Sequence, residues 1–275
     1  MDPKILKRIQ TMRETKGLEK ETLQKIEEAR LIAQDAMDYK SLVTLYWEES
    51  LVWQHIVMNM VAEDNISGDN QGSTILADAK DKMARAGRTA YELVTKHGLD
   101  RQKPIALRFL GRICNYLNEH DKAKKHYEDA LDLLDPSDKS RLELQGFMAS
   151  TLIYLGEIES GLELAKNVYT MFDESDVGKK LKEEDYYVWA VWKTGIPCRV
   201  LQALQDINSP YDKQMFEEWL TKSLQDLQGK GGKTTWGDSR FQFRVDEIGK
   251  AFKLLGSLFL FFVLHSKIAT FITIR

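Results

Sequence analysis

The sequence repeats part of itself at an interval of 38 residues, counted from Tyr116 to Tyr154. Residues 116–119 read Tyr-Leu-Asn-Glu and are followed by Ala123, while residues 154–157 read Tyr-Leu-Gly-Glu and are followed by Gly161. An internal period of this size is typical of stacked helix pairs, because one pair cannot bury its apolar face alone. The repeat predicts an architecture but no ligand, since such a fold only presents a surface.

Composition narrows both the fold and the partners. The chain has 275 residues, 43% of them hydrophobic, which is enough to bury a sizeable core, and only five prolines. Long runs that alternate apolar and polar residues are absent, so the β classes lack their period of two. The 39 Lys and Arg nearly balance the 42 Asp and Glu, whereas nucleic-acid binders usually carry a basic excess. We therefore expect an all-α fold and no nucleic acid as partner.

The location and the chemistry of the protein can be judged from its cysteines, its histidines and its N-terminal residues. Cys114 and Cys198 lie far apart in apolar contexts, which fits reduced core residues of a cytoplasmic protein. The first residues lead into a charged helix without a secretory signal. The five histidines lack the spacing of metal ligands, and no Gly-x-Ser-x-Gly motif is present. We expect no catalytic residue, no metal and no cofactor.

Apolar spacing predicts a succession of helices. Residues 23–31 and 42–46 form a helical hairpin around a polar corner at 38–40, and the second helix continues to Met60. Residues 63–72 have the composition of a loop, after which Ser73 or Thr74 could cap a helix that ends at Gly98. Further helices are expected at about 104–118, 120–134, 138–155, 158–173, 183–206 and 212–228. Pro197 should kink the helix that contains it.

Four segments are expected along the chain. These are an N-terminal helix at 1–19, a repeat domain at 20–228, a Gly/Lys linker at 229–239, and a C-terminal helix with an apolar tail at 240–275. Residues 229–235 are similar to the end of a phosphate-binding loop, but Leu227 stands where that motif needs glycine, so a linker is favoured. The apolar run 254–264 is too short to span a bilayer. A buried last helix, a weak membrane anchor and a partner-dependent or non-native end all remain open for it, so membrane contact is undecided.

Small and large side chains follow a defined pattern in residues 104–137. The pattern is Leu107-x2-Leu110-Gly111-x2-Cys114, then Ala123-x3-Tyr127-x2-Ala130, then Pro136. It resembles the tetratricopeptide repeat family. Gly111 and Ala123 would leave room where two helices cross, and Tyr127 would fill the space between them. Residues 142–172 keep the small residues, with Ala165 in place of the aromatic one.

The resemblance extends along the chain with longer spacing. The first small position of each second helix is predicted at Leu42, Met83, Ala123 and Gly161, spaced 41, 40 and 38 residues apart, and a fifth pair is drawn through Phe216, 55 residues after Gly161. The usual repeat of the family is 34 residues. What the resemblance implies is a right-handed α-solenoid, a superhelix of antiparallel helix pairs, with a concave groove that binds peptides or proteins.

Candidate partner-binding residues lie on the helix expected at 104–118. Arg108, Arg112 and Asn115 share one face of it, and the resemblance implies that this face lines the groove, where guanidinium groups could grip a carboxylate. The next such helix contributes Tyr154 but does not reproduce the carboxylate clamp known in the family. The alternative is that these arginines are ordinary solvated or ion-paired surface. Two aromatic clusters are expected to be mostly core, with Trp47 and Trp192 as the rings most exposed.

Three functions remain open. The favoured one is a non-enzymatic scaffold that binds a peptide or protein in its groove. The others are a regulatory sensor whose repeats clamp a small peptide or signal, and a membrane-tethered adaptor that uses the apolar C-terminal tail. Phosphate binding at residues 230–235, which would make the protein an enzyme, is a weaker fourth alternative.

Overall fold

The structure is a computed structural model that describes residues 1–64, 70–227 and 239–256. Every regular element in these ranges is helical, which confirms the all-α prediction. The chain divides into two compact parts, an N-terminal half, Met1–Leu134, and a C-terminal half, Asp135–Arg275. The predicted linker at 229–239, except its last residue, and the apolar run beyond residue 256 lie outside the described residues.

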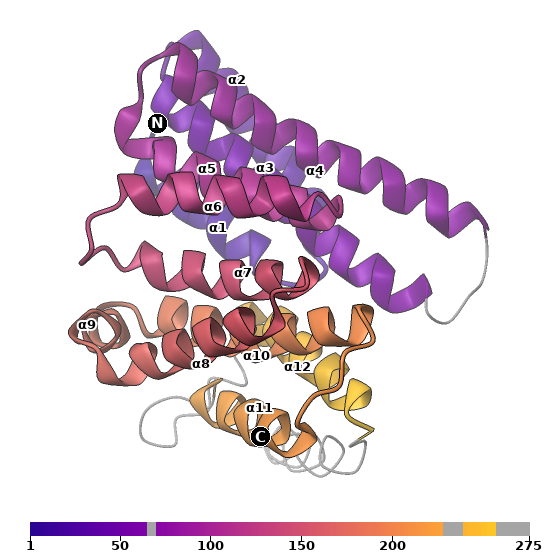
Figure 1. Cartoon of the computed structure of the whole chain (residues 1–275). Helices are drawn as coiled ribbons and strands as arrows, with labels where there is room; N and C mark the ends of the chain where they lie inside the picture. The colour runs from indigo at the N-terminus through magenta and orange to yellow at the C-terminus, as the bar shows by residue number, and fades with distance from the viewer. Residues whose placement is uncertain (65–69, 228–238, 257–275) are drawn as a thin grey trace, which may run out of the picture. The chain divides into compact units, whose positions relative to one another are not determined.

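The N-terminal half is a series of helices in which each packs against the next (Figure 1). Its elements are α1 (Pro3–Arg13), α2 (Glu19–Asp35), α3 (Tyr39–Asp64), α4 (Asn70–Lys96), the short 3-10 helix η1 (Asp100–Gln102), α5 (Lys103–Tyr116) and α6 (His120–Leu133). Helix α1 also packs against α3. Helices α3, α4 and α5 share one apolar cluster, in which the rings of Trp47 and Phe109 are stacked with centroids 5.6 Å apart.

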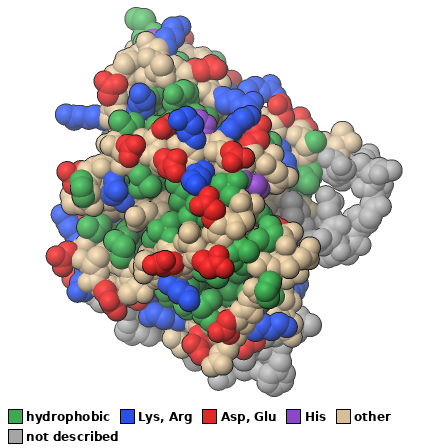
Figure 2. Space-filling model, in the orientation of Figure 1, with side chains coloured by type: hydrophobic (Ala, Val, Ile, Leu, Met, Phe, Trp, Pro, Cys, Tyr) green, Lys and Arg blue, Asp and Glu red, His purple; other side chains and the backbone are tan. Residues whose placement is uncertain are grey.

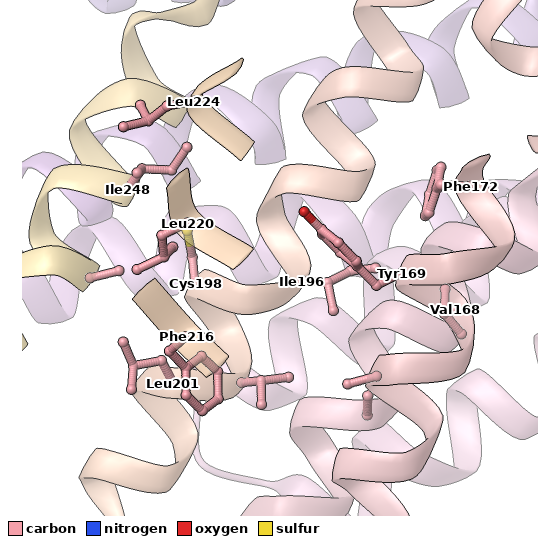
Figure 3. Packing of buried hydrophobic residues seen from close by; sticks show 14 of the residues in the cluster. Val168, Tyr169, Phe172, Ile196, Cys198, Leu201, Phe216, Leu220, Leu224 and Ile248 are labelled. Carbon is pink, nitrogen blue, oxygen red and sulfur yellow. The ribbon is translucent and has the colours of Figure 1, made fainter. Parts of the chain in front are cut away.

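The C-terminal half is arranged around its longest helix, α10. Its elements are α7 (Ser140–Tyr154), α8 (Ile158–Glu174), α9 (Asp176–Glu184), α10 (Tyr186–Asp206), α11 (Lys213–Leu227), the short 3-10 helix η4 (Ser239–Phe241) and α12 (Gln242–Leu254). Helix α10 packs against α7, α8, α9, α11 and α12. Figure 3 shows Tyr169 and Phe172 of α8 on one side of α10, and Phe216 and Leu220 of α11 with Ile248 of α12 on the other.

The repeated segment of the sequence is a helix-ending turn. Asn118 and Gly156 both adopt left-handed backbone, with φ of 59° and 82°. The following residue, Glu119 or Glu157, donates its N–H to the carbonyl five residues earlier, at 2.8 and 2.9 Å. This hydrogen bond is that of the Schellman motif, which satisfies carbonyls left unpaired at a helix end. The 38-residue repeat in the sequence therefore arises because the same turn ends α5 and α7.

The same turn also ends three helices that are not part of this repeat. Left-handed residues follow α2, α4 and α10 at Met37 (φ 51°), Gly98 (φ 60°) and Asn208 (φ 53°). In each case the next residue donates to the carbonyl five positions back, at 2.8 to 2.9 Å. The prediction that Gly98 provides a left-handed stop is confirmed. Different residue types fill one backbone conformation, so the repeat in the sequence reveals only two of the five turns and Gly98 a third.

Close helix crossings occur where the small residues predict them. A Cβ atom added to Gly111 of α5 would lie less than 3.0 Å from the ring of Tyr127, which is fully buried in α6. A Cβ added to Gly161 of α8 would lie 2.7 Å from the backbone oxygen of Ala149 in α7. Both glycines permit backbones to approach within each hairpin, as the pattern in residues 104–137 predicts for Gly111.

Several predicted details of the helices are wrong. Leu42 and Met83 do not occupy equivalent positions of two successive pairs, because they lie on consecutive helices, α3 and α4, that pack against each other. Ser73 and Thr74 lie inside α4, which begins at Asn70. The inference failed because α3 and α4 have 26 and 27 residues, so one helix and its turn are nearly as long as a repeat.

The wide spacing before Phe216 has a structural reason. The helix predicted at 183–206 is α10, which begins after Asp185, whose side chain accepts from the N–H of Val188 and caps the helix. Helix α9, which occupies the preceding residues, was not predicted. The additional helix α9 lies between α8 and α10 in sequence and lengthens this pair. Pro197 does not end the helix early, because α10 continues through it to Asp206.

Candidate functional site

The predicted residues Arg108 and Arg112 lie on α5, half-buried and close to α3. Arg112 donates from Nη2 to Oε1 of Gln54 on α3. Both guanidinium groups also lie near the ring of Phe109, at 5.3 Å for Arg108 and 5.7 Å for Arg112. Phe109 in turn is stacked on Trp47, so Trp47 is buried and not exposed as expected. Each arginine therefore packs its charged end over an aromatic layer.

Asn115 is occupied within its own hairpin. Its Nδ2 donates to the Tyr127 hydroxyl at 3.2 Å, and its Oδ1 lies 3.1 Å from Nδ1 of His120. Tyr127 is the ring that packs on Gly111. These bonds tie α5 to the start of α6, so the described contacts of Asn115 are structural.

Helices α1 and α3 contribute further polar side chains. The buried carboxylate of Glu48 on α3 lies 2.7 Å from Nε of Arg13 and accepts from Gln10 at 3.0 Å. Two turns further along α3, Nδ1 of His55 lies 3.1 Å from the backbone oxygen of Arg13. Because a carbonyl only accepts, Nδ1 of the neutral ring carries the proton. We call Gln10, Arg13, Glu48, Gln54, His55, Arg108 and Arg112 the N-terminal polar face.

Burial keeps His55 uncharged. Desolvation is the main cause that lowers the pKa of His55 to about 4, and it outweighs the opposing charge of Glu14. Arg13 and Arg112 act in the same direction as burial.

A corresponding arrangement exists on α7, α10 and α12 of the C-terminal half. The guanidinium of Arg199 on α10 lies 4.3 Å from the ring centroid of Phe147 on α7. Seven residues further along each of these helices, the Tyr154 hydroxyl donates to the carboxylate of Asp206 at 2.7 Å. Tyr154, the fourth predicted residue, thus lies on the side of α7 that meets α10.

Arg244 of α12 reaches the same part of α10. A Cβ atom added to Gly195 would lie less than 3.0 Å from Nη1 of Arg199 and from Nη2 of Arg244. Arg244 also forms an ion pair with Glu247, one turn further along α12. We call Phe147, Tyr154, Gly195, Arg199, Asp206, Arg244 and Glu247 the C-terminal polar face.

The sequence contained a signal for α10 that the search for motifs missed. Trp192, Gly195, Arg199, Gln202 and Asp206 recur at three- and four-residue spacing on a helix that is otherwise largely buried. A polar stripe on such a helix marks the side that is not covered by the core. Arg244 has no such signal, because its position depends on how α12 packs.

The opposite side of α10 carries a buried charge network. Lys193 is fully buried, and its ammonium contacts carboxylates of Asp173 on α8 and Asp226 on α11 at 2.8 and 2.6 Å. It also lies over the rings of Tyr169 and Trp189, at 4.9 and 4.8 Å. Burial alone would raise the pKa of Asp173, but the hydrogen bond and charge of Lys193 outweigh it and lower that pKa. This network joins α8, α10 and α11 around a fully buried ammonium group.

The remaining candidates are the two cysteines, possible metal ligands and possible membrane-spanning helices. Cys114 and Cys198 are buried free thiols, as expected, and burial raises the pKa of Cys198 to about 12. In residues 1–64, 70–227 and 239–256, no group of His, Cys, Asp and Glu side chains is placed to hold a metal ion. No helix within the same ranges is long and apolar enough to cross a bilayer. Acidic and basic side chains are interspersed over the face drawn in Figure 2, which fits the balanced charge.

No protein-family profile matches the chain, and no curated protein is significantly similar to it in sequence.

Proposed function

We propose that this chain is a non-enzymatic scaffold that binds a peptide or protein segment at the polar face of either half. On this proposal the helix pairs stack as a right-handed, tetratricopeptide-like solenoid. Helices α1, α3 and α5 supply the binding surface of the N-terminal half, and α7, α10 and α12 supply that of the C-terminal half. The pattern in residues 104–137 and the glycine crossings at Gly111 and Gly161 support the architecture. Location in the cytoplasm is part of the same proposal.

The observation that carries the proposal is the placement of an arginine beside an aromatic ring in each half of the chain. Arg112 lies near Phe109 on α5, and Arg199 lies over Phe147 where α10 meets α7. A stacked guanidinium keeps its donors in a fixed plane, so less entropy is lost when it binds a carboxylate or a backbone carbonyl. Aromatic rings beside it supply rigid apolar contact area. Peptide recognition needs both kinds of contact.

The test is a selection of binding peptides from a random display library, followed by measurement of their affinity. Arg112→Gln and Arg199→Gln should each weaken a selected peptide roughly 10-fold, the loss of one charge-assisted contact. Arg85→Gln is the matched control, because Arg85 is exposed on α4 and forms its ion pair with Asp81 one turn away on the same helix. Failure to select any peptide, or equal affinity in all three variants, would contradict the proposal.

The sensor alternative makes a different prediction for the same peptides. A sensor would change its compactness when it binds, which small-angle scattering measures as a change in radius of gyration, whereas a rigid scaffold would not. The membrane-tethered alternative depends on residues 254–275, most of which lie outside the described residues. Binding of the full chain to anionic vesicles tests it directly.

A further inference from the structure

Exposed large apolar side chains gather at the end of α2. Leu31, Ile32 and Met37 are 55%, 56% and 71% exposed, and the other large exposed apolar residues of the described chain are scattered over α1, α4, α6 and α8. Single exposed apolar residues are ordinary on a protein surface. Three of them between residues 31 and 37 form a patch, which calls for a partner. We call Leu31, Ile32 and Met37 the α2 patch.

The patch lies outside the part of α2 that builds the core. The buried side of this helix packs against α1 and α3 and consists of Thr22, Ile26, Ala29 and Ala33. These positions recur at helical spacing, and neither Leu31 nor Ile32 belongs to that stripe. The core of the N-terminal half is therefore complete without the patch, and none of the patch residues is part of the N-terminal polar face.

The turn residue Met37 adopts a backbone conformation that disfavours its side chain. Its φ is 51°, whereas the corresponding residue in the other four helix-ending turns is glycine or asparagine. A left-handed conformation is unfavourable for a long side chain, and an exposed methionine gains little from packing in return. Strained residues of this kind are concentrated at functional positions. Methionine also adapts its shape to an apolar partner surface.

The rim of the α2 patch is acidic. Asp35 lies one turn after Leu31 and is exposed, and its carboxylate has no ion-pair or hydrogen-bond partner among the described residues. Glu28 lies one turn before Ile32, is half exposed, and pairs with the exposed Lys25 on the same helix. Such exposed pairs are weak, so a cation of a partner can replace the lysine.

Apolar side chains beside carboxylates define the partner by its chemistry. They are complementary to an amphipathic helix that has apolar side chains on one face and lysine or arginine beside them. We infer that the α2 patch docks a basic amphipathic helix of a partner protein. The inference does not depend on the proposed function, because it uses a different surface.

A second copy of the chain fits the patch less well. Two α2 helices that pack antiparallel about the midpoint of Leu31 and Ile32 would bring Glu28 of one copy beside Asp35 of the other, because both carboxylates lie three residues from the pair. Like charges placed together oppose association. A partner with basic residues has the opposite effect.

The experiment measures the affinity of the full chain for three synthetic helical peptides of about five turns. The first carries leucine along one face and arginine beside it. The second replaces each arginine with glutamate, and the third replaces each leucine with serine. Fluorescence anisotropy of the labelled peptides gives their affinities. The first peptide should bind at least about 10-fold more tightly than the other two, and its affinity should fall as salt is added.

Variants of the chain locate the site. Leu31→Ser and Ile32→Ser should each weaken binding of the first peptide roughly 10-fold, since each removes an apolar contact. Asp35→Asn should weaken it roughly 3-fold. Leu133→Ser and Asp132→Asn are the matched controls, because Leu133 is 51% exposed at the end of α6 and Asp132 is exposed beside it. Both controls should leave the affinity unchanged.

Met37→Gly separates binding from stability. The change removes an apolar contact and relieves the left-handed backbone, so it should raise the melting temperature while it weakens binding of the first peptide roughly 3- to 10-fold. A purely structural role of Met37 would not lower the affinity of a protein that has become more stable.

Several results would overturn the inference. One is failure of the first peptide to bind, or equal affinity for the first and second peptides. Another is unchanged affinity in both Leu31→Ser and Ile32→Ser. A dimer of the full chain, measured by sedimentation, that Leu31→Ser dissociates would make a second copy the occupant of the patch in place of a basic helix.

Discussion

The ammonium of Lys193 lies 2.6 Å from the carboxylate of Asp226, and no part of the lysine side chain reaches solvent. The two residues are 33 positions apart and join α10 to α11. Asp173 of α8 contacts the same ammonium. Lys182 and Lys222 also lie near Asp173, at 3.6 and 3.2 Å, so the network spans four helices.

Removal of the buried cation should be severely destabilising. Lys193→Met leaves Asp226 and Asp173 partly buried without their central partner, which costs about 3–5 kcal/mol of unfolding free energy. Urea denaturation followed by circular dichroism measures this. Lys222→Met is the control, because that lysine is half-exposed and should cost no more than about 1 kcal/mol. Equal losses in the two variants would show that burial does not set the strength of this network.

Stability should fall with acid through His55. Its pKa is about 4 in the folded protein and about 6.5 in an unfolded chain, so the unfolded chain binds the proton first. The contribution is therefore fully present above about pH 6.5 and is lost between there and about pH 4, at about 1 kcal/mol for each pH unit. His55→Gln should flatten this part of the pH profile in urea unfolding. An unchanged slope in that variant would assign the acid sensitivity to other groups.

Two glycine-to-alanine variants should act in opposite directions. In Gly111→Ala the new methyl overlaps the buried ring of Tyr127, which overpacks the α5–α6 crossing and costs about 1–3 kcal/mol. In Gly195→Ala the methyl meets only the ends of Arg199 and Arg244, so helix propensity should dominate and the melting temperature should stay level or rise. Thermal unfolding compares the two. Loss of stability in Gly195→Ala would mean that the arginine pair is fixed more firmly than its contacts indicate.

Among the left-handed residues of the five helix-ending turns, Met37 has the side chain least suited to that backbone conformation. A left-handed conformation costs a side chain such as methionine about 1–2 kcal/mol, and this one is 71% exposed, so it gains little from packing. Met37→Gly should raise the unfolding free energy by roughly 0.5–1 kcal/mol after the greater entropy of unfolded glycine is subtracted. Gly156→Ala at the equivalent turn should lower it. Thermal melting of both variants checks the pair of signs.

Prediction from sequence succeeded where the cause was local. The turn at residues 116–119, the stop at Gly98 and the crossing of Gly111 with Tyr127 all involve residues within one hairpin. It failed where one helix is as long as a repeat, as with Leu42 and Met83. Of the predicted site residues, Arg112 contacts α3 and Tyr154 contacts α10, whereas Asn115 is bonded within its hairpin.

The sequence by itself determined the helical class, most helix boundaries and the small residues at two crossings, because these depend on neighbours within about one hairpin. Only the tertiary structure decided that Lys193 meets both Asp173 and Asp226, and that Arg199 and Arg244 meet above Gly195. Those contacts depend on the packing of helices that are separated in sequence by a variable length of chain. No fixed spacing encodes them, so periodicity could indicate the polar stripe on α10 but not the arginine from α12 that completes it.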